Sequence, residues 1–221
     1  MKKIFFYVAA LLLLISCDDE PMYSCNEQTD RWVKENMEVV RNIDRDSFLT
    51  YSDSKKRAMY RAFTPEQRIS MWKEKLNEVK MLSWNEKELS HITKLEEFID
   101  MHEECFGDVQ SGENDDVFDL FFYQWQTYAI DSLGWDRQTG FAIAGTLNRM
   151  KGNREIEGGD FNMRKSIQTR SKSEECDCSS DFLNDFCPIV MDCNDKAECE
   201  KVPDSCGWLW AKDCNGLCDF R

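Results

Sequence analysis

The sequence lacks an excess of positive charge. Its 221 residues include 28 Lys and Arg against 42 Asp and Glu, so the formal net charge at pH 7 is −14. A nucleic-acid-binding protein needs a basic face to neutralise phosphates, and this composition does not provide one. We therefore expect no nucleic-acid partner.

Histidine is also scarce, which removes the usual catalytic and metal-binding patterns. The two histidines, His91 and His102, belong to no H-E-x-x-H motif and have no evident third ligand. No serine lies in a Gly-x-Ser-x-Gly context, and no acid–base pair stands out among the many carboxylates. The sequence thus predicts no enzyme, no catalytic residue, no metal and no cofactor, with both histidines satisfied within helices.

Long apolar runs are absent beyond the N-terminus, where one spans residues 4–15 behind two lysines. A membrane-spanning helix needs ~20 apolar residues, so this run has the length of a signal-peptide core instead. It leads into Leu-Ile-Ser-Cys, which resembles the lipobox of bacterial lipoproteins, whose cysteine is acylated. We expect a lipoprotein signal peptide over 1–16 and lipidation of Cys17. An ordinary secretory signal is the alternative.

Residues 17–29 are expected to form a lipidated acidic tether. Asp18, Asp19 and Glu20 follow the cysteine directly, and such a run is similar to a surface-display signal of bacteroidete lipoproteins. Acyl chains hold a protein at a membrane because each buried methylene contributes ~0.8 kcal/mol. The expected location is the outer membrane, with the protein on the cell surface; a periplasmic orientation is the alternative.

Residues 30–150 show helical periodicity and predict a bundle of five or six helices, without a convincing strand. The strongest helix start is 64–67, Thr-Pro-Glu-Gln, which has a capping hydroxyl, a proline at the first helical position and a capping-box glutamine. The stretch 83–86 repeats the capping-box spacing. Thr29 or Asp30 is the expected cap of the first helix.

A later helix is expected to start at Asp115, to end at Gly134, and to be followed by one more over 141–150. Apolar side chains lie nearly all round it, so we expect it at the centre of the bundle. The residues on its two sides are Val117, Leu120, Phe121, Gln124, Trp125 and Tyr128, and opposite them Phe118 and Phe122.

Residues 151–175 have no sustained periodicity and carry six Lys and Arg residues among Gly, Asn and Ser, which predicts a flexible basic linker. Two alternatives involve cleavage. Gly158-Gly159 resembles the double-glycine end of a bacteriocin leader, and cleavage after Arg170 or Lys172 would release the C-terminal segment.

The chain has 11 cysteines, and they gather at its C-terminal end. A segment this short and poor in aliphatic residues cannot fold on apolar burial alone. It has no Cys-x-x-Cys pair and no histidine, so we expect disulfides rather than zinc, with the pairing left open. The cysteines of this segment are Cys176, Cys178, Cys187, Cys193, Cys199, Cys206, Cys214 and Cys218.

Two cysteines lie outside both the lipobox and this segment. In an oxidising compartment, the simplest arrangement is a disulfide between Cys25 and Cys105. The alternative is two separate thiols, with Cys105 buried as a small apolar residue.

The C-terminal segment also resembles a known family. The carrying elements are Cys176-Asp177-Cys178, Cys187-Pro188-Ile189, Cys193, Cys199, Cys206-Gly207, Trp208-Leu209-Trp210, Cys214-Asn215-Gly216 and Cys218. They look like the bacteriocin fulvocin C-related proteins. The resemblance covers the last fifth of the chain and implies a peptide that acts on the envelope of competitor bacteria. Trp208, Leu209 and Trp210 are then candidate target contacts; the alternative is that they form a small core beneath the disulfides.

Together these features predict a mainly α protein, with an N-terminal helical bundle followed by a small disulfide-rich module over 176–221. The expected function is that of an exported, lipid-anchored, bacteriocin-like protein whose C-terminal module acts on competitors, attached or released. Its partners would be the membrane, through the lipid, and a competitor-cell target. The alternative is a non-toxic surface lipoprotein that uses the same module for binding or adhesion.

Overall fold

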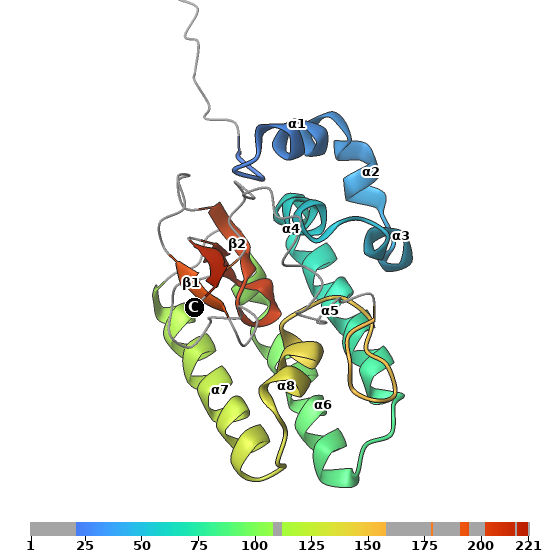
Figure 1. The fold of residues 1–221 in the computed structure, drawn as a ribbon, viewed down its shortest axis with the longest axis vertical. Coiled ribbons are helices and arrows are strands. Elements are labelled where there is room, and N and C mark those ends of the chain that lie inside the picture. The colour runs from blue at the N-terminus through green and yellow to red at the C-terminus, as the bar shows by residue number, and fades with distance from the viewer. Residues whose placement is uncertain are drawn as a thin grey trace, which may run out of the picture.

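The computed structural model describes residues 21–107, 112–157, 178, 191–194, 202–214 and 216–220. Helices dominate these residues, which confirms the predicted mainly α fold (Figure 1). The helices are α1 (Glu27–Glu35), α2 (Met37–Asn42), α3 (Arg45–Leu49), α4 (Asp53–Ala62), α5 (Pro65–Lys80), α6 (Glu86–Met101), α7 (Gly112–Asp131) and α8 (Arg137–Ala144), with 3-10 helices η1 (Glu103–Phe106) and η3 (Trp208–Trp210). The strands are β1 (Met191–Asn194), β2 (Val202–Cys206), β3 (Lys212–Cys214) and β4 (Leu217–Phe220).

The predicted start of α5 is confirmed, with both hydrogen bonds of a capping box. The Thr64 hydroxyl accepts from the backbone N–H of Gln67 at 3.2 Å, and the Gln67 side-chain oxygen accepts from the backbone N–H of Thr64 at 3.1 Å. Pro65 occupies the first helical position, where no intrahelical N–H bond is lost. Local capping chemistry therefore sets this boundary.

Two other predicted starts are wrong, because an asparagine caps the helix in each case. Asn26 caps α1, so Thr29 and Asp30 lie inside that helix. Asn85 caps α6 and forms a capping box with Glu88, in place of the box expected at 83–86. Asparagine accepts backbone N–H bonds at this position as well as serine does.

Helices α5 and α6 form an antiparallel pair at the heart of the bundle (Figure 1). Trp72 and Leu76 of α5 are fully buried, as are Ile92 and Leu95 of α6. Their spacing of three and four residues places each pair on one helix face, as the sequence periodicity predicts.

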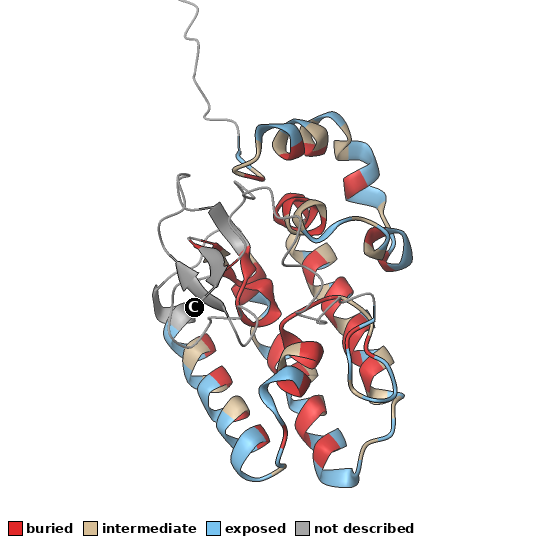
Figure 2. Cartoon of the chain, in the orientation of Figure 1, coloured by how far each residue is buried: buried red, intermediate tan, exposed pale blue. Residues whose placement is uncertain are grey.

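Helix α7 is not central, contrary to the prediction. It starts at Gly112 and buries one face only, through Phe118, Phe122, Trp125 and Ala129 (Figure 2). Its other face stays exposed and carries Val117, Leu120, Tyr123, Tyr128 and Ile130. The aromatic stripe is thus a core face, and α7 flanks the bundle.

The chain after α8 forms a short buried loop over 145–148, which three cations hold in place. Arg45 donates a hydrogen bond to the Leu147 carbonyl at 2.8 Å. Lys75 donates to the backbone carbonyl of Asn148, and Lys56 donates to the side-chain amide oxygen of Asn148. All three cations are buried. Arg45 and Lys75 thereby satisfy two backbone carbonyls of a loop that lies beyond the end of α8.

The C-terminal segment packs against this loop and against the bundle. Strands β2 and β3 are antiparallel, and the Cys206–Cys214 disulfide joins them across the turn that holds η3. Strand β1 pairs with β4, also antiparallel, with Cys193 opposite Cys218. Figure 1 shows β2 and η3, in red, beside α4, α7 and α8.

We call residues Trp208–Trp210 the aromatic turn. Its side chains are 2%, 0% and 4% exposed and belong to the same core as α5 and α6. The Trp210 indole donates to the Gly145 carbonyl at 3.0 Å, and the Tyr60 hydroxyl donates to the Leu209 carbonyl at 3.1 Å. The ring of Trp208 stacks on Phe122 with centroids 5.4 Å apart. The segment that was expected to stand apart therefore supplies part of the bundle core.

The backbone of this turn is strained. Ser205, Leu209 and Trp210 have φ values of 73°, 49° and 53°, in the left-handed region that disfavours residues with a Cβ. Each such residue costs about 1–2 kcal/mol. Packing of the indoles in the core, together with the disulfide, must offset this strain.

The expected linker is ordered at its beginning. Met150 and Ile156 form an isolated β-bridge around a turn, and Arg154 makes an ion pair with Glu88 at 2.9 Å. Residues 151–157 thus belong to the folded body. The remainder of 151–175, with Gly158-Gly159, Arg170 and Lys172, lies outside the described residues.

We expect Trp210→Ala to lower the free energy of unfolding by about 3–5 kcal/mol, the usual cost of truncating a buried aromatic side chain. Urea unfolding of the oxidised protein, followed by far-UV circular dichroism, measures it. The control is Tyr123→Ala on α7, whose side chain is 55% exposed, with an expected change of at most about 0.5 kcal/mol. Equal losses for the two variants would contradict the integration of the aromatic turn into the core.

Candidate functional site

The predicted target contacts are buried. Trp208 and Trp210 lie in the bundle core, and Leu209 between them is fully covered. They cannot touch a target while the fold is intact, so this prediction is wrong. The alternative, that they form a core beneath the disulfides, is confirmed as to their burial. The core is larger than expected, because their neighbours include Tyr60, Trp72 and Phe122 of the helices.

The described cysteines of the C-terminal segment take part in disulfides or occupy paired positions on two strands. Cys206 and Cys214 are bonded to each other, and Cys178 is disulfide-bonded and buried. Cys193 and Cys218 are opposite each other on β1 and β4. The predictions for Cys17, Cys176, Cys187 and Cys199 lie outside the described residues.

The predicted Cys25–Cys105 bridge does not form. Cys25 is disulfide-bonded, whereas Cys105 is a buried thiol in η1 and belongs to no disulfide. Cys105 is 3% exposed and packs in the bundle core, as the alternative had it. Cys25 must therefore pair with another cysteine of the chain.

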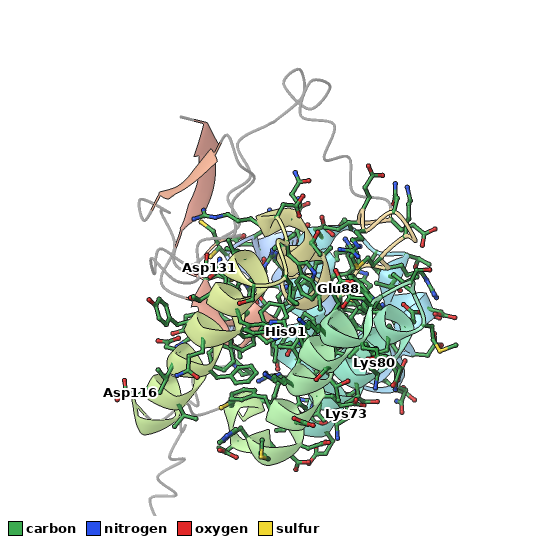
Figure 3. The ribbon with its side chains drawn as sticks, turned by 90° about the horizontal axis from the view of Figure 1, so that it is seen from below. Lys73, Lys80, Glu88, His91, Asp116 and Asp131 are labelled. Atoms are coloured by element: carbon green, nitrogen blue, oxygen red, sulfur yellow. A yellow bond between two sulfur atoms is a disulfide. The ribbon has the colours of Figure 1, made fainter. Side chains whose placement is uncertain are left out.

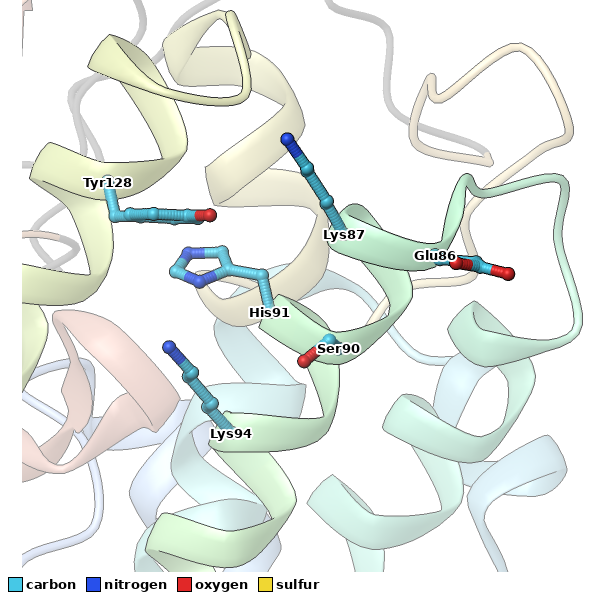
Figure 4. A pocket seen from close by; sticks show the side chains of 6 residues that line it. All are labelled: Glu86, Lys87, Ser90, His91, Lys94 and Tyr128. Atoms are coloured by element: carbon cyan, nitrogen blue, oxygen red, sulfur yellow. The ribbon is translucent and has the colours of Figure 1, made fainter.

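The described surface offers a different candidate site, a pocket between α6 and α7 that we call the His91 pocket. It is lined by Glu86, Lys87, Ser90, His91, Lys94 and Tyr128 (Figure 4). Its volume is about 200 Å³. Five of these residues come from two turns of α6, and Tyr128 comes from α7. In Figure 3, His91 lies between the ribbons of these helices.

His91 forms the floor of the pocket and joins the two helices. Its Nε2 lies 3.0 Å from the Trp125 carbonyl, and the Trp125 indole donates to the His91 carbonyl at 3.1 Å. The imidazole stacks on Trp125, with centroids 4.9 Å apart and planes inclined by 11°. A carbonyl only accepts hydrogen bonds, so Nε2 must carry the proton. Nδ1 is then an acceptor, and it is buried without a hydrogen-bond partner among the described residues.

The pKa of His91 is lowered to about 4 from its ordinary 6.5. Burial is the main cause because it penalises the charged imidazolium, and the Lys94 charge lowers the pKa further. The hydrogen bond to Trp125 acts in the opposite direction. His91 is therefore neutral at physiological pH, with its Nδ1 lone pair fixed in place.

The rim of the pocket is cationic on both sides of the imidazole. Figure 4 shows the Lys94 ammonium below the His91 ring and Lys87 above it, while the Glu86 carboxylate points away. The Lys94 ammonium also lies 5.4 Å from the centre of the Tyr128 ring. Both lysines are exposed, and neither has an ion pair within the described part of the chain.

A second layer of contacts fixes this part of α6. Glu88 accepts a hydrogen bond from the Trp135 indole at 2.8 Å and pairs with Arg154. The Arg154 guanidinium also lies 4.5 Å from the centre of the Trp84 ring. The hydrogen bonds from Asn85, Trp135 and Arg154 lower the pKa of Glu88 against the opposing effect of burial. The helix that carries His91 is thus rigidly placed.

His102 has no part in this pocket. It ends α6, and its Nδ1 lies 3.0 Å from Glu104 on the surface. The expectation of two satisfied helix histidines therefore fails for His91, whose second nitrogen is unsatisfied. The sequence signal was the i, i+4, i+7 spacing of Lys87, His91 and Lys94, which places all three on one helix face.

Neither metal binding nor membrane crossing has support in the described residues. Across 21–107, 112–157 and the described C-terminal stretches, no three His, Cys, Asp or Glu side chains are grouped to hold a metal ion. In the same stretches, none of the helices has the length and apolarity to span a bilayer.

No protein-family model matches the chain, and no curated protein or solved structure is significantly similar to it. The geometry of the described residues therefore carries the functional argument.

Peptide mapping of the oxidised protein tests the cysteine assignments. We expect Cys105 to react with a thiol-specific alkylating reagent only after unfolding, because its sulfur is buried. The Cys25 peptide should appear in a disulfide with a peptide other than that of Cys105. A linked Cys25–Cys105 peptide would contradict this arrangement.

The depressed pKa of His91 predicts a loss of stability in mild acid. The unfolded chain takes up a proton on this imidazole near pH 6.5, whereas the folded protein does so only near pH 4. The free energy of unfolding should therefore fall as the pH drops from 6.5 towards 4.

Urea titrations between pH 7 and pH 5 test this, with His91→Gln expected to remove that part of the slope and His102→Gln expected to retain it. An unchanged slope in His91→Gln would show that His91 is not the responsible group.

Proposed function

We propose that this protein is an exported, lipid-anchored envelope protein that binds a ligand at the cell surface as an intact chain. The lipobox-like sequence at Cys17 and the acidic tether behind it support the anchor. The disulfides of the C-terminal segment support an oxidising compartment.

One observation favours binding over release of a toxic peptide, namely the burial of the aromatic turn in the helical core. Release would expose two indoles and Leu209 to water and would leave a cavity between α4, α7 and α8. It would also leave the hydrogen-bonding groups of Tyr60 and Gly145 without their partners. Both effects oppose separation of the segment. Exposing buried apolar area to water costs free energy, and so does leaving a buried polar group without its hydrogen-bond partner.

A second candidate function rests on the cysteine pattern and its resemblance to the fulvocin C-related proteins. In this alternative the protein antagonises competitor bacteria, and the C-terminal segment acts by contact while it stays attached. The acidic composition of the chain works against attraction to anionic lipid, so such an activity would need a specific receptor.

Co-culture of producer and competitor strains distinguishes these functions. For the proposed binding protein, we expect equal competitor survival beside the wild-type producer and beside a deletion strain. Mass spectrometry of the medium should find no fragment that begins between residues 158 and 176. Killing by the wild type but not by the deletion strain would overturn the proposal in favour of an antagonist.

A matched variant separates contact killing from release. Arg170→Gln/Lys172→Gln removes the two basic candidate cleavage points and changes no residue of the core that the structure describes. If killing occurs and persists in this variant without a fragment in the medium, the antagonist acts while attached. If killing and the fragment disappear together, the active species is the released segment.

A further inference from the structure

The His91 pocket contains a buried acceptor without a donor. The side chain of His91 is 2% exposed, and its Nδ1 has no hydrogen-bond partner among the residues that the structure describes. Leaving such a group unsatisfied costs free energy, which a hydroxyl from a ligand would recover. In Figure 4 this nitrogen faces the side of Lys94, whose exposed side chain can move aside to admit a ligand.

The two lysines at the rim indicate the charge of the ligand. Lys87 and Lys94 flank the imidazole and have no carboxylate partner among the described residues. They are seven residues apart, which corresponds to about 10 Å along a helix axis. A single carboxylate cannot contact both ammonium groups when the two lysine side chains are extended. Anionic groups that repeat along a ligand chain can contact both.

Tyr128 supplies the third element, an exposed aromatic face. Its ring is 40% exposed and lies 4.9 Å from the imidazole, centre to centre. Aromatic faces present apolar area beside polar groups, which suits a ring with both C–H and hydroxyl groups. The pocket volume of about 200 Å³ is below the roughly 300 Å³ at which drug-sized sites begin, so it holds one small ring at a time.

We propose that the His91 pocket binds an acidic oligosaccharide, one sugar ring at a time. A sugar hydroxyl donates to His91 Nδ1, the ring lies on Tyr128, and anionic groups on successive sugars pair with Lys87 and Lys94. This site is separate from the C-terminal segment and gives the helical bundle a binding role of its own. It requires neither the lipid anchor nor any action on competitors.

Other ligand classes fit the same residues less well. A metal cation would be repelled by the two ammonium groups. Nucleic acid would meet two lysines on a chain of net charge −14, which is too little positive charge for a duplex footprint. General-base catalysis by His91 is disfavoured, because its pKa is far below the working pH.

Calorimetric titration of the full-length oxidised protein in detergent tests the proposal, with trigalacturonate as the probe. We expect measurable binding of trigalacturonate, much weaker binding of monomeric galacturonate and none of neutral maltotriose. Lys87→Gln/Lys94→Gln should weaken the binding of trigalacturonate at least about tenfold, since charge-assisted hydrogen bonds are lost. Tyr128→Ala should weaken it as well, without unfolding the protein, since the ring is half exposed.

The matched control is Arg31→Gln/Arg41→Gln, which removes two exposed positive charges from α1 and α2 and should leave affinity within about twofold. Three outcomes would overturn the proposal. The first is an affinity for inorganic phosphate equal to that for trigalacturonate, which would indicate a simple anion site. The second is an affinity for maltotriose equal to that for trigalacturonate. The third is the same affinity for trigalacturonate in the two double variants. Because these variants leave the cysteines and the aromatic turn unchanged, the result is independent of the co-culture assay.

Discussion

The 145–148 loop is the point at which the separate parts of this protein depend on one another. After α8 ends, its backbone carbonyls are buried and need donors, since an unpaired buried carbonyl costs as much as a lost hydrogen bond. The donors to these carbonyls come from α3, α5 and the aromatic turn. Lys56 of α4 adds a hydrogen bond to the side-chain oxygen of Asn148 in the same loop. Burial lowers the pKa of Lys75 to about 7, and the charges of Arg45 and Arg149 act in the same direction. Burial and positive neighbours thus both disfavour the protonated form of this side chain. The loop therefore ties α3, α4 and the aromatic turn to the centre of the bundle.

The aromatic turn and the His91 pocket show the same balance between strain and packing. Three residues of the C-terminal segment take left-handed backbone angles, and the indoles of Trp208 and Trp210 are packed on Tyr60, Trp72 and Phe122. In the pocket, the imidazole of His91 loses one hydrogen bond but gains stacking on Trp125 and the paired bonds between α6 and α7. In both places an unfavourable local state persists because the surrounding core holds it, and such states gather at functional sites.

Sequence patterns predicted the local structure of the bundle well and its long-range partners poorly. The capping box of Thr64 and the apolar stripes of α5 and α6 are encoded within a few residues, so periodicity and capping rules find them. The position of α7 depends on what packs against it, and its exposed Leu120 and Tyr123 look like core residues in a sequence. The burial of Trp208 and Trp210 depends on contacts with residues far earlier in the chain, such as Phe122 and Tyr60, which no local pattern reports. The unsatisfied Nδ1 of His91 could likewise not be predicted, because its state as an acceptor follows from the hydrogen bond of Nε2 to Trp125.

The hydrogen bond between Tyr60 and Leu209 joins residues 149 positions apart. Tyr60 is synthesised long before Leu209, so the place of the aromatic turn beside α4 stays empty while most of the chain is made. Completion of the core must wait for the last residues to arrive, and long-range closures of this kind are slow. Until then the nascent bundle exposes the apolar surface that the aromatic turn later covers, which makes a holding chaperone valuable during synthesis.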